Sequence, residues 1–267
     1  MNFTDFARSH GLILDSVVTH KWVSTPTVDH PRKRNGRYKL LGHVGWVQNW
    51  ATMEAPALWK GEGDYPSMDA VWRQAKKDRE EESKKAAAKA GWILHNSKVQ
   101  THPYLTKKGF PDEVGNVWEG LLVIPMRISG RLIGCQLIDE NGEKKFLKGQ
   151  TTKGAAFVMD AKGVPIFAEG YATCLAIRAA MKHIKTRYTI YCCFSANNMK
   201  LIAGQVSGGI VVADNDESGT GELAARSTGK PYWISDTLGF DFNDHWRNRG
   251  EFQSSQSLKK VLLGVKT

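Results

Sequence analysis

The chain has 267 residues, of which 41% are hydrophobic and 24% charged, proportions that are normal for a globular protein and leave room for one large or two modest domains. Its formal charge of +10 makes a polyanion the natural partner, because Lys and Arg release condensed counterions when they neutralise phosphates. No apolar stretch approaches the roughly 20 residues of a membrane span and the N-terminus lacks the pattern of a signal peptide, so we expect a cytoplasmic protein without a membrane partner.

The first predicted domain covers residues 1–62 and is rich in tryptophan, glycine and basic residues. Gly36 and Gly42 punctuate short runs that are typical of β-strands. Exposed tryptophans among basic residues could stack on single-stranded bases, although tryptophans more often belong to a small core. We expect at most one or two tryptophans to touch nucleic acid, and the candidate contacts are Arg34, Arg37 and Trp46.

Residues 63–98 are predicted to form a linker helix. Pro66 and Ser67 provide a start signal, and the stretch 73–90 contains neither glycine nor proline. Large apolar residues are nearly absent between Trp72 and Trp92, so the pattern favours a solvated helix that acts as a spacer. A DNA-binding role for its charges is the alternative that we consider weaker.

Residues 99–163 are predicted to form a small strand-rich subdomain with many basic residues. Apolar runs over 121–125 and 131–138 are typical of strands. The dipeptide Asn141-Gly142 then separates the second run from residues 144–147, and this arrangement favours a tight β-hairpin.

Strands and helices alternate from residue 164 to the end of the chain, which predicts an α/β domain (α+β for the chain overall) with a parallel sheet flanked by helices on both faces. The expected strands are 166–168, 189–194, 209–213 and 232–234. The expected helices are 171–183, a short one near Leu201, one after Gly219, and a C-terminal helix.

Acidic residues follow two of these predicted strands. Glu169 comes directly after the first strand, and Asp214 and Asp216 come after the third. Ligands of such sheets bind at the carboxyl ends of the strands, and alternate residues point the same way, so these three carboxylates are expected to converge. Clustered carboxylates repel one another, and a hard divalent cation such as Mg²⁺ resolves that repulsion.

Other interpretations of these acids exist. An Asp after a strand is often only a helix N-cap or a turn former. The run from Asp214 to Gly219 also resembles the start of a calcium-binding EF-hand loop, but Ala225 stands where the bidentate Glu belongs, so we reject calcium. The chain has no phosphate-binding loop of the type found in ATP-driven helicases.

Two segments carry a resemblance to a known family. Residues 168–173 (Ala-Glu-Gly-Tyr-Ala-Thr) and 211–221 (beginning Val-Val-Ala-Asp-Asn-Asp) resemble the two signature motifs of the TOPRIM fold, which bacterial primases, topoisomerases and some nucleases and recombination proteins share. The likeness is closest to DnaG-type DNA primases, and His102-Pro103-Tyr104-Leu105 and the residues after it look like the phage and plasmid branch. The resemblance covers roughly residues 92–250.

The resemblance implies an activity, a location and partners. A primase joins ribonucleotides on a single-stranded DNA template, using nucleoside triphosphates and Mg²⁺ or Mn²⁺, and it works with a replicative helicase in a bacterial cell or a phage-infected host. Residues 130–134, 144–148 and 153–154 resemble the basic motif of the subdomain that precedes the TOPRIM domain, and residues 241–244 resemble the last acidic motif.

The resemblance also assigns roles to individual residues. Glu169, Asp214 and Asp216 are the implied catalytic residues and metal ligands, and either Asp241 or Asp244 assists them. The cations implied to hold nucleotides or DNA are Arg131, Lys145, Lys148, Lys153, Lys107 and Lys108. A solvated hairpin face is the alternative interpretation of these cations, and it is stronger for Lys148 than for Lys153.

One departure from the family concerns zinc. Many such primases carry an N-terminal zinc module of Cys and His ligands, whereas all four cysteines of this chain lie at or after Cys135 and none forms a C-x-x-C pair. We therefore expect no zinc, buried free thiols, and a zinc-free N-terminal domain as the substitute for template reading.

Three rival functions follow from the same motifs. A TOPRIM nuclease would use the same acids and metal to activate water. A topoisomerase needs a nucleophilic tyrosine in a separate DNA gate, for which the length leaves hardly any room. A catalytically silent module for single-strand binding or recombination is the third alternative.

Overall fold

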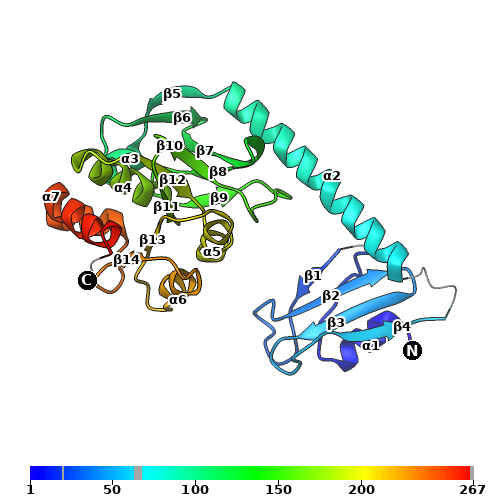
Figure 1. Ribbon diagram of the computed structural model, residues 1–267. Coiled ribbons are helices and arrows are strands. Elements are labelled where there is room, and N and C mark those ends of the chain that lie inside the picture. Colours follow the sequence, from blue (N-terminus) through cyan, green and yellow to red (C-terminus); the bar gives the residue numbers. More distant parts are fainter. Residues whose placement is uncertain (20, 63–67, 265–267) are drawn as a thin grey trace. The chain divides into compact units, whose positions relative to one another are not determined.

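The computed structural model describes residues 1–19, 21–62 and 68–264, and of residues 68–72 and 75 it describes the backbone alone. The described residues form a mixed α/β protein with seven helices and fourteen strands in three sheets (Figure 1). The start signal at Pro66 and Ser67 lies outside the described residues. The chain divides into two compact units, Met1–Asp78 and Arg79–Thr267.

The N-terminal unit contains a four-stranded antiparallel sheet, where the sequence predicts a β-rich domain without giving the pairing of its strands. The strands β1 (Val23–Thr25), β2 (Gly36–Leu41), β3 (Val44–Asn49) and β4 (Ala57–Lys60) lie in chain order. The short helix α1 (Phe3–Ser9), which the sequence analysis does not foresee, begins at an Asn2 cap that accepts the Asp5 backbone N–H at 2.9 Å. Its apolar residues pack on one face of the sheet, with Phe3, Ala7, Leu12, Tyr38 and Val47 in the core.

The predicted linker helix is α2 (Met68–His95), a single helix of 28 residues. The expectation of a solvated spacer is wrong for its second half. Ala86, Ala90 and Ile93 are buried and pack against Val123 and Cys135 of the following sheet. Two of the contacts are made by alanines, whose small side chains do not produce a recognisable apolar stripe.

The second sheet is antiparallel, in the order β5 (Lys98–Thr101), β6 (Val114–Trp118), β7 (Leu121–Ile128), β8 (Arg131–Ile138) and β9 (Lys144–Phe146). The short helix α3 (Pro103–Lys107) connects the first two strands. The hairpin at Asn141-Gly142 is confirmed, with Gly142 at φ 90°. The Asp139 carboxylate stabilises this turn by accepting the backbone N–H groups of Asn141 and Glu143 at 2.9 and 2.8 Å.

The third sheet has the order β10 (Phe157–Asp160), β12 (Tyr188–Cys192), β11 (Val164–Ala168), β13 (Ile210–Ala213) and β14 (Tyr232–Ile234). The last four are mutually parallel, and β10 adds an antiparallel edge. Four helices follow its strands: α4 (Tyr171–His183), α5 (Ala196–Gln205), α6 (Thr220–Ser227) and α7 (Phe242–Leu262). The edge strand β10 falls inside the range 99–163 that the sequence analysis assigns to the preceding subdomain.

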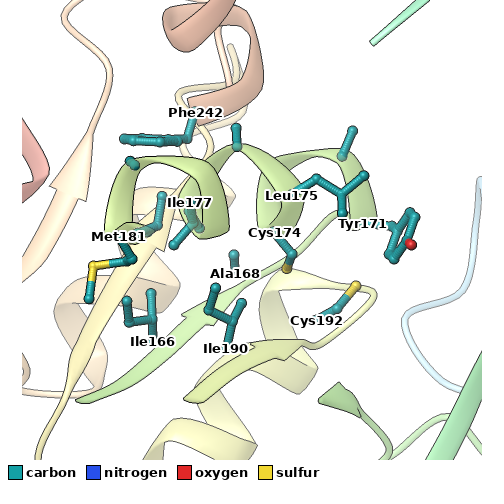
Figure 2. Packing of buried hydrophobic residues seen from close by; sticks show 14 of the residues in the cluster. Ile166, Ala168, Tyr171, Cys174, Leu175, Ile177, Met181, Ile190, Cys192 and Phe242 are labelled. Atoms are coloured by element: carbon teal, nitrogen blue, oxygen red, sulfur yellow. The ribbon is translucent and has the colours of Figure 1, made fainter. Parts of the chain in front are cut away.

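Helices cover both faces of the third sheet, and this explains the continuous apolar runs of its strands. On one face, Ile166, Ile190 and Val212 pack against α4 and α7, as seen around Cys174, Ile177 and Phe242 in Figure 2. On the other face, Phe167 and Val211 pack against residues of α5 and α6. Among the described residues, no helix combines the length and the apolarity that a membrane crossing requires.

Candidate active site

Glu169 follows the last residue of β11 and lies at the carboxyl edge of the parallel strands. Its backbone carbonyl accepts the Phe194 N–H at 2.9 Å, which fixes the chain where it leaves the sheet. The side chain accepts the backbone N–H of Ala196 at the start of α5. Burial raises the pKa of Glu169, and the Lys144 ammonium opposes this shift.

Asp214 occupies the corresponding place after β13. Its Oδ1 atom is shielded from solvent and has no hydrogen-bond partner. Burial, followed by the negative charges of Asp241 and Glu169, raises the pKa of Asp214 to about 7. A buried carboxylate oxygen without a partner is costly, so this residue is poorly explained as a structural turn former.

Asp216 has the opposite character, because it is exposed and its carboxylate is occupied by its own loop. The Ser218 hydroxyl donates to Asp216 Oδ1 at 2.6 Å, and this bond, more than the neighbouring backbone N–H groups, lowers the pKa of Asp216. The turn then places Gly219 at φ 65° before α6. The Asp216 carboxylate thus stabilises its own turn, and its charge contributes to raising the pKa values of Asp214 and Glu169.

The two candidates of the last acidic motif have different surroundings. Asp241 caps α7 by accepting the Asp244 backbone N–H at 2.8 Å, and it also accepts the Thr173 hydroxyl at 3.2 Å. Asp244 completes this capping box by accepting the Asp241 N–H at 3.4 Å. Of the two, Asp241 is the acid whose charge raises the pKa of Asp214, so the structure favours Asp241 as the member of the site.

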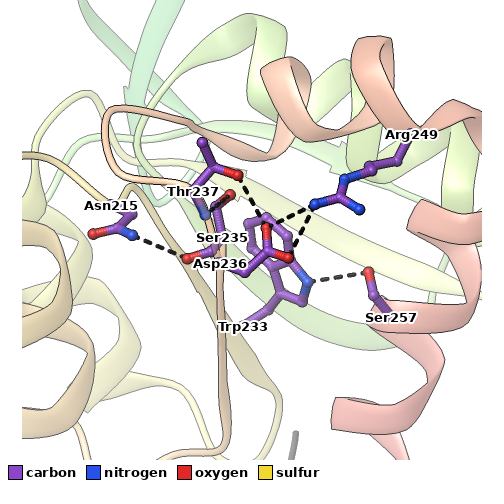
Figure 3. A network of polar contacts seen from close by, with 7 residues as sticks. All are labelled: Asn215, Trp233, Ser235, Asp236, Thr237, Arg249 and Ser257. Atoms are coloured by element: carbon purple, nitrogen blue, oxygen red, sulfur yellow. Dashed lines mark hydrogen bonds and ion pairs between the residues drawn. The ribbon is translucent and has the colours of Figure 1, made fainter.

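A network of polar contacts holds the loops after β13 and β14 together (Figure 3). Asn215 donates its side-chain amide to the Ser235 carbonyl at 3.0 Å and accepts the Gly239 backbone N–H at 2.6 Å. An ion pair at 3.1 Å between Asp236 and Arg249 joins the second loop to α7. These contacts fasten the segment that leads to Asp241 against the loop that begins with Asp214.

Lys144 is a member of the site that the sequence analysis missed. Its ammonium lowers the pKa values of both Glu169 and Asp214. Lys145, the residue that the sequence analysis selected, pairs with Glu143 at 3.2 Å. Successive residues of β9 point to opposite faces, and the ring contact of Phe146 with Phe194 at 6.2 Å places the even-numbered residues toward the acids.

Lys153 lies at a cavity of about 380 Å³ beside the first turn of α5. The cavity is also lined by Ser195, Asn197 and Lys200, and Lys200 is a cation that the sequence motifs do not predict for the site. The Asn198 side chain ties the segment 154–155 to the start of α5. It accepts the Gly154 N–H at 2.7 Å and donates to the Ala155 and Cys193 carbonyls. Glu169 accepts the Ala196 N–H on the same turn, so this acid and the cavity share the start of α5.

The remaining predicted cations are not gathered at this site by any described contact. The Lys107 ammonium donates to the Glu140 carbonyl at 2.8 Å, and Lys108 caps α3. Arg131 and Lys148 are exposed on the second sheet and the loop after it. Arg34, Arg37 and Trp46 belong to the N-terminal unit.

Glu169, Asp214 and Asp241 offer carboxylate oxygens, the ligand type that hard divalent cations prefer, and Oδ1 of Asp214 is buried without a hydrogen-bond partner. As the side chains stand, no three His, Cys, Asp or Glu groups within residues 1–19, 21–62 and 68–264 converge tightly enough to hold a metal ion. The Asp216 carboxylate is exposed and accepts the Ser218 hydroxyl at 2.6 Å.

The comparison with known families and solved structures gave no match: no family model fits the chain, and no solved structure resembles it significantly.

Proposed function

We propose that this chain is a TOPRIM-type DNA primase that makes short RNA primers on single-stranded DNA. The observation that carries the proposal is the buried Oδ1 oxygen of Asp214, which has no hydrogen-bond partner and lies at the carboxyl edge of parallel strands with Glu169 and Asp241 close enough to raise the pKa of Asp214. Four parallel strands flanked by helices on both faces support it, because the segments that resemble TOPRIM motifs fall at the ends of β11 and β13.

Primer synthesis is a nucleotidyl transfer. The 3′-hydroxyl oxygen of one nucleotide forms a bond to the α-phosphorus of the next, the bond from that phosphorus to the bridging oxygen breaks, and pyrophosphate leaves. Glu169 is the proposed acceptor of the hydroxyl proton, because burial raises its pKa and makes it a stronger base than an exposed glutamate. The Ala196 N–H holds that carboxylate in place.

The acids have the second role of holding Mg²⁺ or Mn²⁺. Asp214 is the principal proposed ligand, with Glu169, Asp241 and, after a change of rotamer, Asp216 as the others. The cation supplies charge neutralisation for the triphosphate and alignment of the attacking and leaving oxygens.

Positive side chains around the acids are suited to the nucleotide. The Lys144 ammonium lowers the pKa values of Glu169 and Asp214, and Lys153 and Lys200 line the cavity beside α5. Lys153 and Lys200 thus place two positive charges at one cavity beside the first turn of α5. We propose that this cavity receives the triphosphate. A replicative helicase is the proposed protein partner.

The test is synthesis on a single-stranded template with four ribonucleotides, one of them labelled, in Mg²⁺ or Mn²⁺. We expect labelled oligoribonucleotides whose composition follows the template. The variant Asp214→Asn should lose this activity, and the exposed acid Asp112, changed to Asn, is the matched control. Template degradation without synthesis would instead establish a nuclease, and binding without either reaction would establish a silent single-strand module.

A further inference from the structure

The sheet of the N-terminal unit has one face that α1 does not cover. Tyr38 and Val47 point to the side of α1, where they are buried with Phe3. Residues of opposite parity point the other way, and the register places Arg37 against Gln48 and Lys39 against Trp46 on that side. We call this side the tryptophan face; it comprises Trp22, Arg37, Lys39, Trp46, Gln48, Trp50 and Lys60.

Two tryptophans of this face flank a guanidinium group. The Arg37 Cζ atom lies 4.5 Å from the ring centroid of Trp22 and 5.8 Å from that of Trp50. Both indoles keep a large exposed surface, 42% for Trp22 and 47% for Trp50. Cation–π contacts of this kind hold aromatic rings in place without burying them.

The guanidinium group of Arg37 is held in place by hydrogen bonds to the neighbouring strand. Arg37 donates through Nε and Nη2 to Gln48 Oε1 at 3.0 and 2.8 Å. Gln48 is buried, and its amide donates to the carbonyls of Met53 and Glu54 at 3.4 and 3.2 Å. The arrangement is therefore preorganised, so a ligand that binds there pays little entropy to order it.

The charge of the tryptophan face indicates the class of ligand. The four strands carry Arg37, Lys39 and Lys60 and contain no Asp or Glu. The exposed run Arg32-Lys33-Arg34 precedes β2 and adds further positive charge. Flat aromatic rings next to cations suit unpaired bases joined by phosphates, whereas a protein partner would have to be strongly acidic.

We infer that the tryptophan face binds single-stranded nucleic acid, with bases stacked on Trp22 and Trp50 and phosphates neutralised by Arg37, Lys39 and Lys60. The inference deepens the proposed function by naming a surface for the template strand. It does not require the carboxylate site to be active, because stacking and phosphate contacts involve no chemistry.

Binding of the full-length chain to a fluorescent oligo(dT) measures this directly by anisotropy. Each of Trp22→Ala and Trp50→Ala should weaken the affinity by about 5- to 150-fold, the range that corresponds to loss of one base–aromatic stack. Trp92→Ala is the matched control, since Trp92 is 57% exposed but lies in the other unit, and its affinity should be unchanged. Trp22→Leu and Trp50→Leu, which keep apolar bulk, should weaken binding in the same way, and thermal melts verify that each variant is folded.

An abasic oligonucleotide of the same length separates stacking from charge. It should bind more weakly than oligo(dT), and the tryptophan variants should not weaken its binding further. Equal oligo(dT) affinity of wild type and folded variants would overturn the inference, as would a dimer in sedimentation that the variants abolish. A chain that binds oligo(dT) through these tryptophans but makes no primers would refute the proposed function alone.

Discussion

Asp214 and Asp216 stand two positions apart, yet their environments are opposite. The carboxylate of Asp214 is largely buried with an unpartnered oxygen, and its pKa is raised to about 7. The carboxylate of Asp216 is solvated and accepts the Ser218 hydroxyl, so its pKa is lowered. The first residue costs stability when it is ionised, and the second contributes stability when it is ionised.

This contrast predicts opposite effects of two substitutions on the free energy of unfolding, measured at pH 8 without divalent cation. Asp214→Asn should raise it by about 1 to 4 kcal/mol, with the upper bound set by a pKa shift from 3.8 to about 7. Asp216→Asn should lower it by about 1 kcal/mol, because the bonds from Ser218 and the loop N–H groups weaken. Denaturant titrations of both variants measure the difference.

Activity and stability separate the roles of these residues. Asp214→Asn should reduce primer synthesis by on the order of 10² or more, as loss of a key electrostatic contact does, although the protein becomes more stable. If Asp214→Asn is both destabilised and active, the carboxylate is a structural group and the proposed site is misplaced.

Lys144 and Lys145 offer a second pair for comparison. Lys144→Gln removes the cation that stabilises the charged forms of Glu169 and Asp214, so we expect synthesis to fall by about tenfold or more. Lys145→Gln removes only an exposed ion pair with Glu143, and its activity should stay within about twofold of wild type. Steady-state assays at one saturating nucleotide concentration compare them, and equal losses would contradict the assignment of faces on β9.

At the scale of the elements, burial decides what the sequence can predict. The strands β11, β13 and β14 and the helix α4 were foreseen because helices cover both faces of the sheet, which leaves uninterrupted apolar runs. The edge strand β10 was missed, since its alternate residues are exposed and its pairing partner β12 is about 30 residues away.

The helix α2 shows why its packing could not be predicted. Alanines at 86 and 90 look like solvated positions in the sequence, but each lets the helix approach the second sheet closely. We expect Ile93→Ala, which empties a fully buried position on the same side, to lower the free energy of unfolding by about 2 to 5 kcal/mol. The exposed Lys85, changed to Ala, should alter it by less than about 0.5 kcal/mol. If denaturant titrations give similar changes in the free energy of unfolding for both variants, the second half of α2 is a solvated spacer after all.

The candidate site was predictable in part. Strand-end positions identified Glu169 and Asp214 because the carboxyl edge of a parallel sheet is where such side chains meet. The preference for Asp241 over Asp244 was not predictable, since it depends on the network that ties the loops of Asn215 and Asp236 together. Lys144 was missed because the motif does not reveal which residues of a short strand face the acids.

At the scale of the whole molecule, the chain consists of two units with separate cores, one around Tyr38 and Val47 and the other around α4 and the third sheet. Separate cores favour separate unfolding transitions, so calorimetry should resolve two. Asp214 lies in the second unit, and its raised pKa makes that transition depend on pH.

The sign follows from linkage. A carboxyl whose pKa rises from 3.8 in the unfolded chain to about 7 in the folded one favours folding at low pH, and this contribution is lost as the pH rises toward 7. Without divalent cation, the free energy of unfolding of the second unit should fall by about 2 to 3 kcal/mol between pH 5 and pH 8.

Added Mg²⁺ binds the ionised carboxylates, so it should raise the melting temperature of the second unit, and by more at pH 8 than at pH 5. The Asp214→Asn variant should lose most of the pH dependence and most of the Mg²⁺ effect, while the transition of the N-terminal unit stays constant throughout. A Mg²⁺ effect that is equal at both pH values, or that persists in the variant, would show that the cation binds elsewhere.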